Sequence, residues 1–191
     1  MNRHIFAAVP IPSHVKRTIG ELSEVLKEKL PFKQWVHQKD LHLTLAFLGQ
    51  TSQNQLINLK ESFHMNIHDL PSFTLTVSRA GFFGKLGQPR IFWLGVEKEA
   101  GLFTLQRTVH GLCQKAGFPV ETRPYSPHIT IAKRWGDAEA SINSVFDENM
   151  INPVAGLTFE VRSIVLYETH LDKVPKYNVI EEFNLKGEDE H

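Results

Sequence analysis

The stretch HLTLAFLG, residues 42–49, has the composition of a buried β-strand, yet two polar side chains interrupt it. His42 and Thr44 are two positions apart, and residues at that spacing in a strand point to the same side of the sheet. Leu43 and Leu45 then point to the opposite side. We therefore predict a strand whose apolar face joins the core, while its polar face presents an imidazole and a hydroxyl group.

A second stretch, HITIAK at 128–133, repeats this pattern. His128 and Thr130 share one face, and Ile129 and Ile131 share the other. A lone histidine is often structural or solvent-facing, and the chain has 10 histidines, so one motif alone would indicate little. Two matched copies favour a functional site. The motifs begin 86 positions apart (128 − 42), so only the fold can bring them together.

The hydrophobic pattern around the motifs predicts an α+β fold with substantial antiparallel pairing. Apolar residues at helical spacing predict three helices, near 13–30, 52–63 and 102–112. Apolar runs and alternation predict strands at 3–9, 41–48, 73–78, 91–96, 128–133, 158–169 and 176–185. The glycine-rich segment 81–90 is interpreted as a turn or mobile loop, and 136–157 as largely irregular. A slip in apolar alternation predicts a bulge near Arg162 and Ser163.

Composition limits the possible classes of protein. The 191 residues fit one domain, or one domain with two lobes. Lys+Arg and Asp+Glu both number 21, so a broad basic surface for non-specific nucleic-acid binding is not expected. The single cysteine, Cys113, allows neither an internal disulfide nor a thiolate metal cluster. The short apolar run at 4–9, followed by Pro10 and Pro12, does not read as a signal peptide or membrane span, so we expect a soluble, cytoplasmic protein.

Two imidazoles and two hydroxyl groups facing one space suit the cleavage of a phosphodiester. Histidine titrates near neutrality, so one ring can accept a proton from water while the other donates a proton to the leaving oxygen. Threonine hydroxyls can donate hydrogen bonds to the non-bridging phosphate oxygens as negative charge develops. This chemistry needs neither a metal nor another cofactor, and we predict none.

A zinc site is the alternative interpretation of the two histidines. It requires a third ligand from elsewhere in the chain, such as Cys113, His37 or His110. Cys113 belongs to the apolar face of the third predicted helix, where a thiol is usually part of the core.

Other residues near the motifs are candidates for substrate contacts. Arg123 and Tyr125 shortly precede the second motif, and either could contact the substrate or brace the loop. Phe47 lies on the face opposite His42 by strand alternation, so we assign it to the core. Trp93 is also assigned to the core, although it could stack on a base.

The paired motifs resemble the signature of the two-histidine (2H) phosphoesterase superfamily. Within it, the chain looks like the RNA 2',3'-cyclic phosphodiesterases, historically called 2'-5' RNA ligases (LigT-like). The resemblance covers most of the chain and rests on HLTLAFLG and RPYSPHITIAK, with softer support, in order, from HIFAAVPIP, IFWLGV, VLYET and KYNVIEEF.

This resemblance implies one bilobal α+β domain over residues 1–191, with two pseudo-symmetric lobes, mostly antiparallel sheets, outer helices and a central cleft. His42 would donate a proton to the leaving oxygen and His128 would activate water, giving a 2'-phosphate end. Thr44 and Thr130 would hold the phosphate. From the residues alone, the near-identical motifs do not distinguish the acid from the base.

The segment after the second motif departs from the family pattern. Many relatives have arginine where this chain has Lys133, and lysine lacks the fork that contacts phosphate with two parallel hydrogen bonds. Strand alternation predicts that Lys133 points away from His128. We expect Arg134, or Lys133 at the strand end, to affect the mouth of the cleft rather than the chemistry.

Three functions therefore remain open from the sequence. The first is metal-independent hydrolysis of 2',3'-cyclic phosphate on an RNA end or a small cyclic nucleotide. The second is 2'-5' RNA ligation or RNA-end binding, since ligation reverses cleavage. The third is action on a non-RNA cyclic or 2'-5' linked nucleotide. In each case we expect a monomer with no obligate protein partner and no membrane association.

Overall fold

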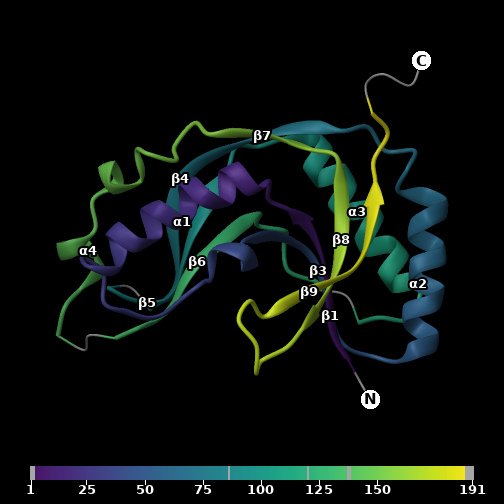
Figure 1. Ribbon diagram of the computed structural model, residues 1–191, viewed down its shortest axis with the longest axis horizontal. Coiled ribbons are helices and arrows are strands. Elements are labelled where there is room, and N and C mark those ends of the chain that lie inside the picture. The colour runs from purple at the N-terminus through teal and green to yellow at the C-terminus, as the bar shows by residue number, and fades with distance from the viewer. Residues whose placement is uncertain (1–2, 86, 120, 137–138, 188–191) are drawn as a thin grey trace.

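A curled, nine-stranded sheet forms the frame of the molecule (Figure 1). The computed structural model describes residues 3–85, 87–119, 121–136 and 139–187. The strand order is β7-β4-β5-β6-β3-β1-β8-β9, with β2 paired to β6 off this path, and the pairings between these strands are antiparallel. The strands are β1 Arg3–Pro10, β2 Phe32–Trp35, β3 His42–Thr51, β4 Phe73–Lys85, β5 Gln88–Val96, β6 His128–Trp135, β7 Thr158–Val161, β8 Ser163–Thr169 and β9 Tyr177–Asn184.

Helices cover the two halves of this sheet. Figure 1 shows α1 and the short α4 with one half, and α2 and α3 with the other. Their bounds are α1 Ser13–Lys27, α2 Gln53–Asn66, α3 Ala100–Lys115 and α4 Ile142–Val145, with 3₁₀ turns at Gln38–Asp40 and Glu148–Ile151. The described helices include none long and apolar enough to cross a membrane. The α+β class predicted from the sequence is confirmed.

The local sequence explains where α1 and α2 form. In α1, the buried residues Val15, Ile19, Leu22 and Leu26 recur every three or four positions and make one apolar face. At the start of α2, the Ser52 hydroxyl accepts a hydrogen bond from the Gln55 amide, and the Gln55 side chain accepts one from the Ser52 amide. This capping box satisfies backbone donors that have no partner within the helix.

The main core and a smaller aromatic cluster involve different residues of the same strands. Leu43 and Ile129 are fully buried in the main core, and they are paired where β3 meets β6. Phe6 and Tyr167, from β1 and β8, form the smaller cluster with Ala8 and Val165. The junction of β3 and β6 therefore joins the two halves of the sheet. That these halves are two lobes of one domain over residues 1–191 stays a prediction.

Of the two interpretations of 81–90, a turn or a mobile loop, the mobile loop is wrong, because a turn at Gly87 joins two paired strands. Apart from residue 86, which lies outside the described residues, and the turn at Gly87, this segment belongs to the β4–β5 hairpin. The glycines permit close packing rather than disorder: a Cβ atom at Gly81 would lie 2.1 Å from the Trp93 ring. Gly84 has a φ of +122°, which other residues rarely adopt.

Two further details of the sheet differ from the sequence-based expectation. Strand β2, at Phe32–Trp35, is missed because four residues are too short to show a clear alternation. The segment 158–169 does not form one bulged strand. It is two strands that meet at Arg162 and pair with different partners, β7 with β4 and β8 with β1. The apolar alternation slips because one strand ends and another begins at Arg162, and not because a single strand carries a bulge.

Candidate active site

The two His-x-Thr motifs lie side by side where β3 and β6 pair. Leu43 is opposite Ile129 in this antiparallel contact. That register places His42 opposite Thr130, and Thr44 opposite His128. Neighbouring positions in a strand alternate between faces, so these four half-buried residues share the face opposite the buried Leu43 and Ile129. The fold thus brings together the four residues that the sequence predicted.

Both imidazoles are held in the same way. His42 Nδ1 lies 2.7 Å from the Asp40 carbonyl oxygen, and His128 Nδ1 lies 2.8 Å from the Ser126 carbonyl oxygen. A carbonyl oxygen only accepts, so Nδ1 donates its hydrogen in each ring. Nε2 is then the nitrogen left for chemistry in each ring. His42 Nε2 is 3.1 Å from the Thr44 hydroxyl, which places the imidazole and hydroxyl of the first motif in direct contact.

Aromatic rings surround each imidazole. The ring of His42 lies 4.8 Å from Phe6 and 5.1 Å from Tyr177, measured between centroids. The ring of His128 lies 5.1 Å from Phe83 and 6.1 Å from Trp93. Each histidine is therefore supported by side chains of its own half of the sheet, which limits the rotation of the ring.

The surroundings of His42 favour a neutral imidazole. Burial lowers the pKa of His42 to about 4; the hydrogen bond to the Asp40 carbonyl opposes this shift, and the positive charges of Lys133 and Lys16 add to it. At neutral pH in the ligand-free protein, Nε2 of His42 therefore carries no proton, and it accepts the hydrogen bond from the Thr44 hydroxyl. A bound phosphate would add negative charge beside the ring and favour its protonated form.

Asp40 is a supporting residue that the sequence analysis missed. It is 4% exposed. Its carboxylate accepts hydrogen bonds of 2.9 and 3.0 Å from the Lys176 amide and one of 3.1 Å from the Tyr177 amide, while its carbonyl holds His42. Asp40 thus ties the first motif to the start of β9. The sequence did offer one signal: Asp40 precedes His42 by two residues, as Ser126 precedes His128, and in both motifs the residue at that position holds the imidazole.

The prediction that Lys133 points away from the site is wrong. Ile131 and Ala132 are both buried, and the register between β5 and β6 shifts beside them. This irregularity breaks the alternation on which the prediction rested. The charge of Lys133 contributes to the lowered pKa of His42. A lysine therefore stands close to the first motif.

The three predicted substrate contacts differ in their surroundings. The hydroxyl of Tyr125 donates a 3.0 Å hydrogen bond to the Thr44 carbonyl, so this residue braces the second motif's approach loop against β3. Arg123 is exposed and forms a 2.6 Å ion pair with Glu121 on the same loop. Arg134 is exposed and has a φ of +63°. The structure places only Tyr125 in direct contact with a residue of the paired motifs.

The two aromatic residues assigned to the core have different surroundings. Phe47 is 73% exposed, so its assignment to the core is wrong. Register shifts between β1 and β3 break the alternation that was used to place it. Its ring lies 6.2 Å from Phe6, which in turn contacts His42. Trp93 is buried, as predicted, but it packs beside His128.

The residues considered as zinc ligands make other contacts. Cys113 is fully buried, and burial raises its pKa to about 12. His110 Nε2 lies 3.0 Å from the Glu121 carbonyl oxygen, and His37 Nδ1 accepts a hydrogen bond from the Lys39 amide. Within the described part of the chain, no group of three or more His, Cys, Asp or Glu side chains is arranged to hold a metal ion.

Comparison with known proteins identifies close relatives. A family described as the 2'-5' RNA ligase superfamily matches residues 11–173. The chain is 40% identical over 184 residues to an RNA 2',3'-cyclic phosphodiesterase of Geobacillus stearothermophilus, an alignment that spans 96% of this chain and 58% of that protein. It is 31% identical over 183 residues to the Bacillus subtilis protein of the same name, spanning 95% of this chain and 96% of that one.

Solved structures show the same fold. Escherichia coli LigT in complex with 3'-AMP matches with a TM-score of 0.77 and 23% identity, covering 97% of this chain and 99% of that chain. TT0787 of Thermus thermophilus matches with a TM-score of 0.76 and 26% identity, with the same coverage. The LigT likeness supports the arrangement of the curled sheet and its helices.

Proposed function

We propose that this chain, which belongs to the 2'-5' RNA ligase superfamily, hydrolyses the 2',3'-cyclic phosphate end of an RNA. The observation that carries the proposal is that both histidines are held in the same way. In each ring Nδ1 is hydrogen-bonded to a backbone carbonyl, so Nε2 is the nitrogen that can exchange a proton with the substrate or water. The names of the Geobacillus and Bacillus relatives support the same activity. Two such nitrogens on one face of the sheet can act on opposite sides of one phosphorus atom.

In the proposed reaction, His128 removes a proton from a water molecule as its oxygen attacks phosphorus. The bond between phosphorus and the ribose O3' breaks, and His42 gives a proton to O3'. The product carries a 2'-phosphate and a free 3'-hydroxyl group. One histidine gains the proton that the other loses, so proton exchange with solvent restores both for the next cycle. No metal-bound water is needed, and we propose a metal-independent reaction.

His42 must be protonated before it can act as the acid. Burial keeps it neutral in the free protein, with a pKa of about 4. The negative charge of the bound cyclic phosphate opposes the effect of burial and of Lys133, and so favours uptake of a proton by His42. We therefore expect substrate binding itself to cause protonation of His42.

Two further features suit a nucleotide substrate. Thr44 and Thr130 lie beside the opposite motif's histidine and can donate hydrogen bonds to the non-bridging oxygens, while Lys133 adds positive charge. Phe47 presents an exposed ring near the first motif, and such a ring can stack on a base. These contacts would orient the cyclic phosphate between the two imidazoles.

The experiment measures turnover, in excess EDTA, of an oligonucleotide that ends in a 2',3'-cyclic phosphate. Chromatography separates the product from the substrate. We expect conversion to the 2'-phosphate product by the unaltered protein, and a loss of at least about 100-fold in His42→Ala and His128→Ala, as for removal of a general acid or base. His14→Ala, which alters an exposed histidine of α1, is the matched control. Full activity in both motif variants, or activity only after metal is added, would refute the proposal.

The same assay separates hydrolysis from the alternatives. Supplying a second RNA with a free 5'-hydroxyl group tests for joining through a 2'-5' linkage. Binding of cyclic-phosphate RNA without turnover would favour an RNA-end-binding module. A preference for a cyclic or 2'-5' linked nucleotide outside RNA would favour the third function.

A further inference from the structure

A cavity of about 660 Å³ is lined in part by Asp40 and Tyr177, which contact His42. It lies between α1, β2, the end of β6 and the segment that precedes β9. Three of its lining residues also touch or influence the first motif: Asp40 holds the His42 ring, Tyr177 packs against that ring, and Lys133 acts on its pKa. The cavity therefore adjoins the residues that hold His42, and its volume lies within the range of about 300–1,000 Å³ that is typical of small-ligand sites.

The cavity wall formed by the sheet is positively charged. Lys33, Lys133 and Lys176 reach it from β2, β6 and the residue before β9. Across the described residues, none of these three ammonium groups has a hydrogen-bond or ion-pair partner. Burial lowers the pKa of Lys133, and the nearby charge of Lys176 lowers it further, so Lys176 lies close enough to act on Lys133. Uncompensated lysines that converge in this way form a site for an anion.

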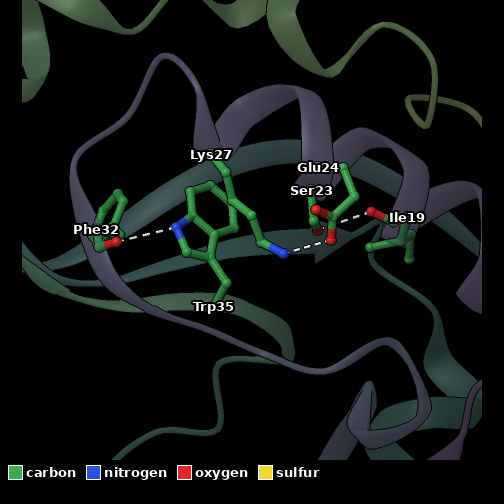
Figure 2. Close-up of polar contacts among 6 residues, drawn as sticks. All are labelled: Ile19, Ser23, Glu24, Lys27, Phe32 and Trp35. Carbon is green, nitrogen blue, oxygen red and sulfur yellow. Dashed lines mark hydrogen bonds and ion pairs between the residues drawn. The ribbon is translucent and has the colours of Figure 1, made fainter.

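The opposite wall, on α1, has a different character. Its carboxylates are Glu21 and Glu24, and Glu24 pairs with Lys27 of the same helix (Figure 2). Below the helix lies Trp35, whose indole Nε1 donates a 3.1 Å hydrogen bond to the Phe32 carbonyl (Figure 2). This bond fixes a half-buried aromatic ring at the cavity wall, where a nucleobase can stack. The cavity thus combines cations on one side with a held aromatic ring.

We propose that this cavity binds the nucleotide that precedes the cyclic-phosphate end, with its phosphodiester at Lys133 and Lys176 and its base against Trp35. This inference rests on the proposed function and deepens it, because it makes an RNA end, rather than a free cyclic mononucleotide, the preferred substrate. A mononucleotide would occupy the site between the motifs and leave the cavity empty. The neutral net charge of the chain agrees with a short binding site confined to the RNA end.

The experiment compares three substrates of increasing length. They are a 2',3'-cyclic mononucleotide, the same compound with a 5'-phosphate, and a dinucleotide that ends in the cyclic phosphate. We expect kcat/KM to rise at each step, by about five-fold for the lysine–phosphate contact, which is about 1 kcal/mol at 1.4 kcal/mol per factor of ten. Lys176→Gln should remove most of the gain for the dinucleotide. Lys98→Gln, which removes an exposed charge outside the cavity lining, is the matched control.

Salt dependence gives a second readout. Each phosphate contact on single-stranded RNA adds about 0.7 to the slope of log affinity against log salt. We expect that difference between the dinucleotide and the mononucleotide in the unaltered protein, and its disappearance in Lys176→Gln. A merely structural effect of the substitution would not change the slope selectively.

The possible outcomes are distinct. Equal kcat/KM for the mononucleotide and the dinucleotide would overturn the inference, and so would a gain obtained entirely from the 5'-phosphate, because the cavity would then hold only an anion. Absence of turnover for all three substrates would instead contradict the proposed function. In that event, equilibrium binding of the three matching 2'-phosphate products still tests the cavity, with tighter binding of the dinucleotide expected.

Discussion

Acidification should destabilise this protein through His42. The folded state holds this imidazole neutral, with a pKa of about 4 compared with 6.5 for an unperturbed histidine. Between these two values the unfolded chain binds a proton that the folded chain does not bind, so the free energy of unfolding falls as the pH falls from about 6.5 to about 4. Above that window the contribution of His42 to the pH dependence vanishes.

The size of the effect follows from the gap between the two pKa values. A difference of one pKa unit corresponds to about 1.36 kcal/mol, so the full gap of about 2.5 units corresponds to about 3.4 kcal/mol. At pH 4.5 the pH has fallen through most of the range between the two pKa values, so about 2.5 kcal/mol of stability is lost relative to pH 7.5. Because the side chain is half-buried rather than fully enclosed, we take this value as an upper bound.

The assay is urea unfolding at pH 7.5, 6.5, 5.5 and 4.5 for the unaltered protein and for His42→Gln. The substitution removes the titrating group, so the unfolding free energy of the variant should fall less than that of the unaltered protein as the pH falls. Exposed His14, changed to Gln, is the control and should leave the pH dependence of the unaltered protein in place. Parallel stability curves for the unaltered protein and His42→Gln would refute the reasoning.

Three further predictions concern residues around the site. Asp40→Asn should lower the free energy of unfolding by about 1–3 kcal/mol, because a buried acceptor of backbone amides loses its charge; an unchanged urea midpoint would contradict this. Tyr125→Phe should lower it by about 1 kcal/mol and reduce kcat, since the bond to the Thr44 carbonyl is lost, whereas stability equal to that of the unaltered protein would show that the bond contributes nothing. Phe47→Ala should raise the KM for cyclic-phosphate RNA by about five- to ten-fold through lost stacking, with almost no change in melting temperature. Met65→Ala, which shortens another exposed apolar side chain, should leave that KM unchanged, and an equal effect in both variants would exclude stacking.

Much of the secondary structure could be predicted because it depends on local spacing. The helical face of α1 and the capping box of α2 are both visible within a few consecutive residues. The polar face of β3 was also predictable, because alternation within one strand places His42 and Thr44 together. Alternation failed where the strands are irregular, at Phe47 in β3 and at Lys133 in β6, since a bulge shifts every later residue to the other face.

The sequence by itself determined the identity of the four motif residues and the face that each pair shares, because both follow from the two-residue period of a strand. Only the tertiary structure decided that Leu43 lies opposite Ile129, and with this contact that the two motifs meet. It also decided the contacts that connect distant segments, including the Asp40 carboxylate on the start of β9 and the lysines that converge beside His42. These depend on the register between strands far apart in the chain, which local periodicity does not specify.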